Sequence, residues 1–475
     1  MAWHDALAPQ RMERVAVLAP IDRLRPILVT LGDAGVVEPE WLDVPTGPAG
    51  QALQSIQRRR PQGEVEAQVS AQPANVAELE NRGDVDLLIG EAELELLGGS
   101  TVREGSVAAL VGWCPVDVVR SLAARLAPLG ASVTPLPRPP GSQPPTCLRS
   151  SGTSGAFQPL VNTYGTLPYA DLNPSALAGV AYVVMFGMMF GDVGHGLLLA
   201  VLGALIWLVP RGPLASLSRL RWAVPFVLGA AVASITFGFA YGEAFGPTGL
   251  VPTLWLRPLD HTTTLLAVSL GIGATFLACA YVLGSVNRFR EGGWVPMLVG
   301  LSGLAGAGLF LGLVLAGFGW HGHLGSLEFV GVAMALVGLM LGFLGLFGTA
   351  GGRVSGTMQA SVELFDGVVR IVTNTVSFAR LAAFGLTHAA LGALVWSGTV
   401  ALWRVGGVVG MLAAVVVFMI GTAVAFALEA LVAGVQALRL EYYEIFSRIF
   451  TGEGRRFRPW HILIRPTEEA PCLPG

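Results

Sequence analysis

The chain has 475 residues, of which 53% are hydrophobic and 13% are charged, and its formal net charge at pH 7 is −3. Together with a mean hydropathy of +0.62, these values argue against an ordinary soluble globule and favour a membrane protein. The four cysteines are scattered and form no CxxC pair, which argues against a disulfide framework and a cysteine zinc site.

The N-terminal third, residues 1–150, is polar and net acidic, and it is predicted to form a small α/β domain. No apolar run of the signal-peptide type occurs near the N-terminus, so we expect this domain to stay in the cytosol. Alternating and helix-periodic stretches occur twice, which predicts two small α/β lobes. The expected strands are 11–20, 106–115 and 131–137, and the expected helices are 21–35 and 116–130.

Stretches rich in proline and glycine separate these elements. Residues 44–75 are rich in Pro, Gln and Gly and are predicted to be a loop or linker, so no long coiled coil is expected between the lobes. A Pro-rich stretch at 134–146 is a second linker. Residues 151–173 then connect the α/β domain to the apolar part of the chain.

Apolar segments follow one another from about residue 174, which predicts a mainly α membrane protein with about eight transmembrane helices. The first two spans together exceed the ~20 residues that a bilayer needs, so we expect a break at Gly191–Gly194. The last two spans are expected to be long and tilted. Gly271 and Gly273 in the fourth span are expected to allow close helix packing. The predicted spans are 174–190, 194–210, 222–245, 262–286, 294–317, 327–349, 367–401 and 406–432.

Arginine placement gives an independent check on the number of spans. With the N-terminus inside, eight spans place the loops at 211–221, 287–293 and 350–366 and the C-terminus in the cytosol. These segments carry 11 of the 16 arginines in residues 151–475, whereas the opposite loops hold only Arg257 and Arg404. This is the positive-inside pattern, and seven spans would break it. The inner loop and tail arginines are Arg211, Arg219, Arg221, Arg288, Arg290, Arg353, Arg448, Arg455, Arg456, Arg458 and Arg465.

Two arginines lie within apolar stretches, Arg380 in the segment 371–395 and Arg439 in the segment 426–446. A guanidinium in the hydrocarbon costs about 3 kcal/mol on insertion scales. It also cannot lose its proton to avoid that cost. Two such charges on successive spans therefore indicate a functional site.

Polar and titratable residues accompany both arginines. His388 lies about 12 Å beyond Arg380 along its helix, on the outer side. Glu429 lies about 15 Å outward of Arg439 on the next helix, and Gln436 shares its face. The acidic candidates on the inner side are Glu363, Asp366 and Glu441.

This arrangement suits two offset half-channels that are separated by a fixed positive barrier. Simpler interpretations remain open. Each arginine could pair with a glutamate to lock two helices together, and Glu429 with Gln436 could be a satisfied packing network. Asp366 and Arg370 have the i,i+4 spacing of a surface salt bridge.

The segment MFGMMFGDVGHGLLL (185–199) is a second dense motif. We interpret Gly191, Asp192, Gly194 and His195 as a tight helical hairpin in which Asp192 caps the next helix. The alternative is that Asp192 and His195 are metal ligands or a proton relay. No Walker A, G-x-G-x-x-G or nucleophile-elbow motif occurs, so we expect no catalytic residue, no metal site and no cofactor in this chain.

Four motifs occur in an order that resembles one known family. FGMMFGDVGHG (186–196), SFARLAAFGLTHAAL (377–391), LEALVAGVQALRL (428–440) and TGEG (451–454) resemble subunit a, or subunit I, of the V/A-type rotary ATPases. The likeness runs continuously over about 160–460. The N-terminal domain matches the family in pieces. Residues 36–105 are too few to form the family's long coiled coil, so the chain resembles a short form with a reduced arm.

The resemblance implies a membrane stator. Arg380 and Arg439 match the paired arginines that face a rotating proteolipid (c) ring, and Glu429, His388 and Gln436 match half-channel positions. Asp366 matches an acidic position of the inner half-channel. Implied partners are the c ring, peripheral-stalk subunits through the N-terminal domain, the central-stalk and nucleotide-binding subunits indirectly, and the lipid bilayer, without nucleic acid. The implied domains are 1–150 (cytoplasmic), 151–173 (linker), 174–451 (transmembrane ion translocation) and 452–475 (cytoplasmic tail).

The implied function is coupling of proton or sodium translocation to rotation, with ATP hydrolysis on other subunits, in a multi-pass protein of the plasma membrane if the source is prokaryotic. Two alternatives stay open. A stand-alone channel or transporter would conduct ions without a rotor, although no internal repeat of the transporter kind is visible. A non-transporting scaffold derived from the same family would fit the shortened arm.

Overall fold

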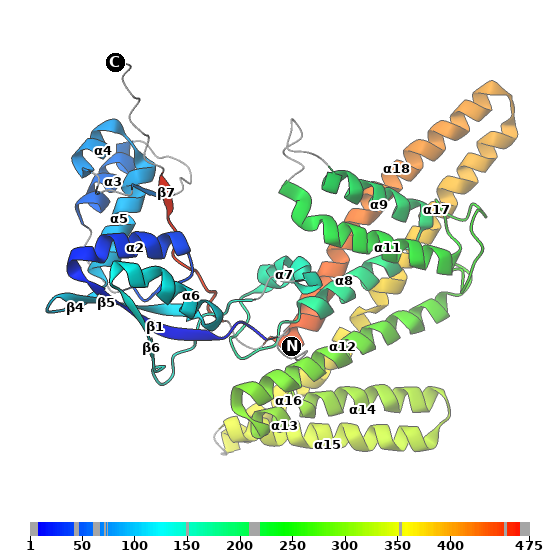
Figure 1. Cartoon of the computed structure of the whole chain (residues 1–475). Helices are drawn as coiled ribbons and strands as arrows, with labels where there is room; N and C mark the ends of the chain where they lie inside the picture. Colours follow the sequence, from blue (N-terminus) through cyan, green and yellow to red (C-terminus); the bar gives the residue numbers. More distant parts are fainter. Residues whose placement is uncertain are drawn as a thin grey trace. The chain divides into compact units, whose positions relative to one another are not determined.

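The computed structural model describes residues 8–41, 47–59, 67–70, 73, 75–148, 152–208, 219–350, 354–450 and 454–465. They form two compact units (Figure 1). The α/β unit comprises Pro9–Arg149 and Gly454–Gly475, and the helical unit comprises Met1–Ala8 and Ser150–Glu453. The expected inner arginines Arg211 and Arg353, residues 451–453 of the TGEG motif and the tail beyond Arg465 lie outside the described residues.

One antiparallel sheet organises the α/β unit. Its order is β2-β5-β1-β6, and β4 pairs with the free part of β5. Because β1 pairs with both β5 and β6, the strands of the two expected lobes belong to a single sheet. The strands are β1 Met12–Pro20, β2 Glu38–Pro39, β3 Gln68–Ser70, β4 Val102–Glu104, β5 Val107–Pro115 and β6 Ser132–Leu136, and the helices are α2 Leu24–Ala34, α3 Pro48–Arg59, α4 Val76–Arg82, α5 Val85–Gly99 and α6 Val116–Leu126.

Residues that follow the last apolar helix complete the α/β unit. Strand β7 (Leu463–Arg465) pairs in parallel with β3. Trp460 and Ile462 are buried in the same hydrophobic core as Val15 of β1. The indole N–H of Trp460 donates to a carboxylate oxygen of Glu93 at 3.0 Å. This segment was expected to be only a cytoplasmic tail, and its packing adds a strand and a buried aromatic to the unit.

The linker predicted at 44–75 is wrong over α3 (Pro48–Arg59), which is helical. This helix packs into a small buried cluster, to which it contributes Ala52, while α4 and α5 contribute Leu79, Leu87 and Leu88. Such a small contact needs few apolar residues, so the sequence of α3 shows little hydrophobic periodicity. A carboxylate oxygen of Glu95 in α5 accepts the backbone N–H of Ala49 in the first turn of α3 at 3.0 Å. A cap supplied from another helix leaves no local signal in the sequence.

Among its described residues, the helical unit contains six helices that are long and apolar enough to cross a membrane, as expected of an integral membrane protein. Two shorter apolar helices, α8 with 15 residues and α9 with 16, are the first two predicted spans. The described helices are α7 Gly152–Tyr164, α8 Ser175–Met189, α9 Val193–Leu208, α11 Val224–Tyr241, α12 Thr262–Gly292, α13 Trp294–Val299, α14 Leu304–His321, α15 Gly325–Thr349, α16 Val354–Ser377, α17 Ala379–Val405, α18 Gly407–Leu440 and α19 Ser447–Ile449.

Several boundaries differ from the predicted ones. Helix α12 continues to Gly292 through most of the loop predicted at 287–293, so Arg288 and Arg290 lie in its last turns. The fifth predicted span is interrupted between α13 and α14, where 300–303 form a turn. The loop expected at 350–366 is largely helical, because α16 begins at Val354. The last two apolar segments are accordingly long, 51 residues in Ser355–Val405 and 43 in Gly407–Ile449. In Figure 1, α17 and α18 run side by side as a long helical hairpin.

Gly273 of α12 makes room for Phe378, which is fully buried at the break between α16 and α17. A Cβ atom at Gly273 would lie 2.1 Å from Cγ of the Phe378 ring, whereas a Cβ at Gly271 would meet nothing within 4 Å. The expectation of close packing is therefore confirmed for Gly273 and wrong for Gly271.

We expect Gly273→Val to destabilise the protein by about 1–3 kcal/mol, because the added methyl groups must displace a buried ring. Gly271→Val is the matched control, since it adds the same β-branched side chain to the same helix in open space. Thermal unfolding followed by circular dichroism in detergent would measure both variants. Equal melting temperatures for the two variants would contradict this account.

Asp171 lies before α8, outside the long apolar helices, and is fully buried. Burial raises the pKa of its carboxyl to about 7, and the nearby Glu291 carboxylate adds to that rise. The guanidinium groups of Arg288 and Arg290 act in the opposite direction. Asp171 is therefore protonated in the folded protein at pH values where an exposed aspartate, with a pKa near ~3.9, is ionised.

The stability contributed by Asp171 should fall as the pH rises from about 4 to about 7, because over that window the unfolded chain ionises this carboxyl and the folded protein does not. In Asp171→Asn the group cannot ionise. We therefore expect the difference in melting temperature, variant minus wild type, to increase between pH 5 and pH 8. Asp260→Asn, at an exposed position, is the control. A difference that stays constant with pH would rule the explanation out.

Candidate functional site

Arg380 stands two residues after the break between α16 and α17. The backbone N–H of Phe378 donates to the carbonyl of Thr375 at 3.2 Å, and the N–H of Leu381 donates to the carbonyl of Phe378 at 3.0 Å. These three-residue bonds tighten the backbone and redirect the chain at this point. The guanidinium of Arg380 donates from Nη2 to Oε1 of Glu444 at 3.1 Å. Its Nη1 is buried and has no hydrogen-bond partner among the described residues.

Arg439 of α18 completes a group of charges around one carboxylate. Its side chain is exposed. The positive charges of both Arg380 and Arg439 act on the carboxylate of Glu444, which is only 5% exposed. Both arginines therefore act electrostatically on the same carboxylate, and Arg380 is the one that is hydrogen-bonded to it. Glu444 was missed in the sequence, where its position three residues after Glu441 was the available signal.

A π-helical segment, η4 (Glu441–Phe446), follows α18 and carries both glutamates. Glu441 is fully buried, and neither of its carboxylate oxygens has a hydrogen-bond partner among the described residues. The side-chain oxygen of Gln436 is likewise buried and unpaired there. Unsatisfied buried groups of this kind cost about 1–3 kcal/mol each. Their presence beside a π-helical segment is typical of functional sites.

His388 and Glu429 link α17 to α18 farther along the hairpin. Nδ1 of His388 is hydrogen-bonded to Oε2 of Glu429. Both side chains are largely buried, 5% exposed for His388 and 12% for Glu429. The second oxygen of Glu429 has no partner among the described residues. The structure therefore brings together two residues that were predicted on the outer side of the arginines.

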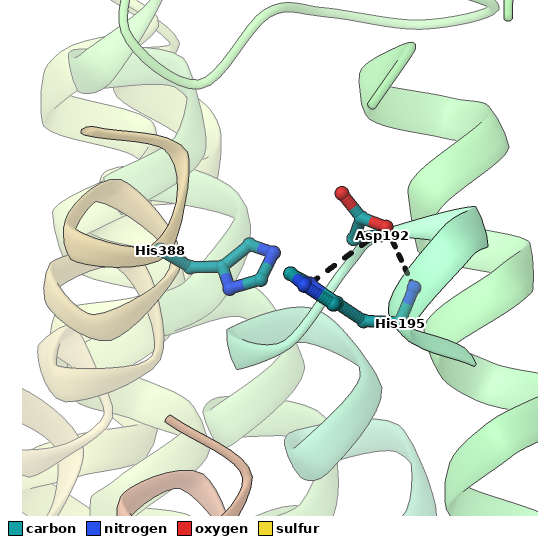
Figure 2. Close-up of side chains that lie close together, drawn as sticks. All are labelled: Asp192, His195 and His388. Carbon is teal, nitrogen blue, oxygen red and sulfur yellow. Dashed lines mark hydrogen bonds and ion pairs between the residues drawn. The ribbon is translucent and has the colours of Figure 1, made fainter. Parts of the chain in front are cut away.

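Asp192 lies in the short connection between α8 and α9 and holds three backbone N–H groups. Oδ1 accepts from the N–H of His195 and of Phe245, and Oδ2 accepts from the N–H of Gly246, each at 2.9 Å. The first bond caps α9, and the other two fix the loop after α11. The side chain of Asp192 is fully buried, and Figure 2 shows its contacts with His195.

The glycines of this connection allow aromatic rings to approach its backbone. A Cβ at Gly191 would lie 2.6 Å from the ring of Tyr241, and one at Gly194 would lie 2.5 Å from the ring of Phe245. Any larger residue at either position would therefore push the hairpin away from α11 and the loop that follows it.

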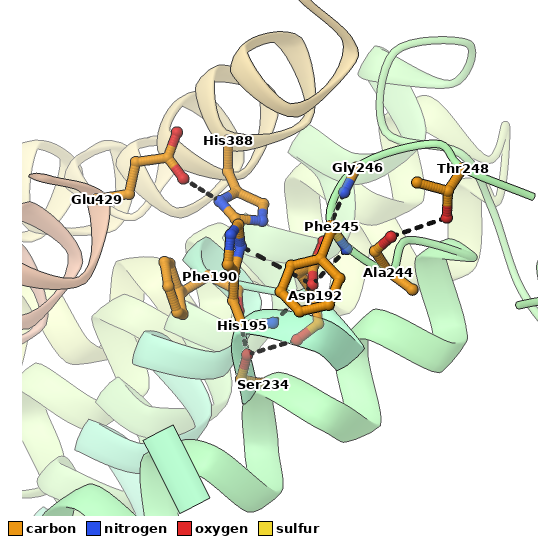
Figure 3. Close-up of polar contacts among 10 residues, drawn as sticks. All are labelled: Phe190, Asp192, His195, Ser234, Ala244, Phe245, Gly246, Thr248, His388 and Glu429. Carbon is orange, nitrogen blue, oxygen red and sulfur yellow. Dashed lines mark hydrogen bonds and ion pairs between the residues drawn. The ribbon is translucent and has the colours of Figure 1, made fainter. Parts of the chain in front are cut away.

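His195 places its imidazole between Asp192 and His388. The ring stacks on Phe190 with 5.5 Å between centroids, and it lies edge-on to His388 at 5.4 Å (Figure 3). Asp192, His195 and His388 each offer one ligand-type atom, and these atoms lie within 4.8 Å of one another. The hairpin and the His388–Glu429 pair thus form one buried polar cluster.

The remaining predicted residues lie around a cavity of about 540 Å³ beside α16. Glu363 and Asp366 line it, and both are exposed. Glu363 accepts a hydrogen bond from Gln359 at 2.9 Å, and Asp366 pairs with Arg370 as the i,i+4 spacing predicted. The complete lining is Leu301, Ser302, Leu346, Val362, Glu363, Asp366, Gly367, Arg370, Ser447 and Arg448.

Comparison with known proteins identifies similar chains. The chain is 26% identical over 327 residues to A-type ATP synthase subunit I of Pyrococcus horikoshii, covering 66% of this chain and 47% of the relative. The corresponding protein of Halobacterium salinarum is 28% identical over 390 residues, covering 67% and 51%. That of Archaeoglobus fulgidus is 27% identical over 418 residues, covering 76% and 59%. The chain spans about half the length of the curated relatives it matches.

A family profile gives the broader placement. It matches residues 100–255 and 358–462, which include the α8–α9 connection, Arg380 and Arg439. These two segments make up more than half of the chain. The chain belongs to the V-type ATPase 116kDa subunit family.

Proposed function

We propose that this chain is the membrane stator of a V/A-type rotary ATPase and couples ion translocation to rotation of a proteolipid ring. The observation that carries the proposal is the pair Arg380 and Arg439, which lie on adjacent helices beside buried, unpaired polar groups. Relatives named as subunit I of an A-type ATP synthase support it. The chain itself would catalyse no hydrolysis, and nucleotide would be processed on other subunits.

The mechanism follows from charge. A carboxylate on the rotor would be neutral while it faces lipid and would meet the two guanidinium groups as the ring turns. Their charge favours the ionised carboxylate and lowers its pKa, so it releases its ion. Moving one charge through 100 mV is worth about 2.3 kcal/mol. The exposed side chain of Arg439 leaves a flank for that carboxylate, while Glu444 orients Arg380.

Two half-channels would lead to and from this position. We assign His388 of α17 and Glu429 and Gln436 of α18 to the outer half-channel. On the inner side we assign the cavity beside α16 with Glu363 and Asp366, together with buried Glu441. The positive arginines between the two paths would prevent an ion from crossing directly.

The proposed topology has eight spans, in which the shorter α8 and α9 form a hairpin in the membrane, and both termini lie in the cytosol. The concentration of arginines in the loops that eight spans place on the cytosolic side supports this topology. The α/β unit would contact peripheral-stalk subunits, and the central-stalk and nucleotide-binding subunits would be coupled through the rotor. In a prokaryote the complex would lie in the plasma membrane.

Reconstitution separates this function from the alternatives. We expect a small hairpin proteolipid to co-purify with the chain, and we expect vesicles that contain the whole complex to acidify on addition of ATP. Vesicles that contain the purified chain alone should not conduct ions. Conduction by the isolated chain would favour a stand-alone channel or transporter. A complex that assembles but moves no ion would favour a scaffold.

A further inference from the structure

We propose that Asp192, His195 and His388 form a binding site for one divalent transition-metal ion of the Zn²⁺ type. Figure 2 shows the three side chains converging from the α8–α9 connection, the first turn of α9 and the middle of α17. All three are buried, and their ligand-type atoms lie within 4.8 Å of one another. Neither the relatives nor the proposed ion translocation calls for a metal here, so this inference goes beyond both.

His195 supplies the first independent observation. Its side chain is only 4% exposed, yet neither ring nitrogen has a hydrogen-bond partner among the described residues. Nδ1 lies 3.8 Å from Oδ1 of Asp192, too far for a hydrogen bond. Two ligands of a tetrahedral zinc ion, each about 2.0 Å from the metal, are about 3.3 Å apart. The Asp192 carboxylate and Nδ1 of His195 are therefore close to the spacing of two zinc ligands. Oδ2 is the oxygen that a metal would take, because backbone N–H groups occupy both lone pairs of Oδ1.

His388 supplies the second observation. Its Nδ1 is hydrogen-bonded to Glu429, which leaves Nε2 as the nitrogen available to a metal. A histidine that binds a metal commonly donates its other ring N–H to a carboxylate, and this contact fixes the tautomer and strengthens the ligand. The His388–Glu429 pair already has that arrangement.

Asp192 is held ready by the backbone. Oδ1 accepts two N–H groups and Oδ2 accepts one, so Oδ2 retains a lone pair on a carboxylate that cannot rotate freely. The carboxylates of Asp192 and Glu429 together balance a 2+ ion, which removes the cost of an uncompensated buried charge.

The donor set indicates the class of metal. Two imidazoles and one carboxylate suit Zn²⁺ and neighbouring transition metals, whereas Mg²⁺ and Ca²⁺ prefer sites made of oxygen ligands alone. Three protein ligands leave a fourth position for water, which is the pattern of an exchangeable rather than a closed structural zinc site. We therefore expect binding that is saturable and reversible with a chelator.

Calorimetric titration of the purified full chain with Zn²⁺ in detergent tests the proposal. We expect one ion per chain, and we expect His195→Ala to weaken binding by at least about a hundredfold. Glu429→Gln, which keeps the three ligands, should weaken it by about ten- to a hundredfold. The control is the double variant His321→Ala/His323→Ala, which removes two exposed histidines and should bind as wild type does. No saturable binding to wild type, or unchanged binding to His195→Ala, would overturn the proposal.

A second measurement needs no variant and so does not depend on the folding of His195→Ala. X-ray absorption spectroscopy at the zinc edge would identify the atoms bound to Zn²⁺ in the wild-type chain. We expect two imidazole nitrogens and one carboxylate oxygen among them. A set of zinc ligands that contains no imidazole nitrogen would refute the site. Neither measurement involves ATP or ion flux, so its result is independent of the stator proposal.

Discussion

Replacing Arg380 with alanine is expected to abolish ATP-driven ion pumping while the complex still assembles. The variant removes a permanent charge that, about 4 Å from a rotor carboxylate at an effective dielectric constant of about 20, is worth about 4 kcal/mol. A loss of that size corresponds to a fall of about a thousandfold in the equilibrium for ion release. Acidification of vesicles that contain the whole complex, with subunit stoichiometry from the same preparation, would measure both outcomes.

The ion pair with Glu444 requires a second variant for a clear result. Arg380→Ala leaves the 5% exposed Glu444 without its cation, which destabilises the protein for reasons unrelated to pumping. The double variant Arg380→Ala/Glu444→Ala removes both partners, so we expect it to recover stability and to remain inactive. Arg404→Ala, at the exposed far end of α17, is the matched control and should pump normally. Pumping by the double variant at the wild-type rate would refute the role of Arg380.

Asp192→Ala is expected to produce the largest loss of stability, about 3 kcal/mol or more, because three backbone N–H groups lose their acceptor at a fully buried position. The cap of α9 and both bonds to the loop at Phe245 and Gly246 would be lost together. Thermal unfolding in detergent and the yield of folded protein would measure the effect.

The comparison with Asp192→Asn separates the capping role from the charge. The amide oxygen can still accept hydrogen bonds, but its NH₂ group would face at least one backbone N–H, so we expect an intermediate loss of stability. Asp260→Ala changes an exposed aspartate in the turn before α12 of the same unit and should have little effect. If the alanine variants at 192 and 260 were equally stable, the buried carboxylate would not hold the hairpin as described.

Elements with a strong local pattern could be predicted from the sequence. Strand β1 and helices α8 and α9 appear within a few residues of the predicted positions, because alternation and apolar length determine them. The salt bridge between Asp366 and Arg370 could also be predicted, from their i,i+4 spacing. The candidate arginines were evident from their cost in an apolar segment alone.

Other features depend on partners that are distant in the chain. Helix α3 receives its cap from Glu95, and Asp192 holds N–H groups more than 50 residues away in the sequence. The pairing of Arg380 with Glu444 joins residues separated by 64 positions, and a π-helical segment, which no simple periodicity predicts, sets the direction of Glu444. Tertiary contacts of this kind leave no signal in a single sequence.

The order in which the chain is synthesised has a consequence for the α/β unit. Its core needs Trp460 and Ile462, and its β3 strand needs β7, yet all of the apolar helices are translated between these residues and the rest of the unit. The unit therefore cannot finish folding while the ribosome is still delivering those helices for insertion. An unfinished core would mark every copy whose synthesis had stalled, so proteases could recognise and remove incomplete copies.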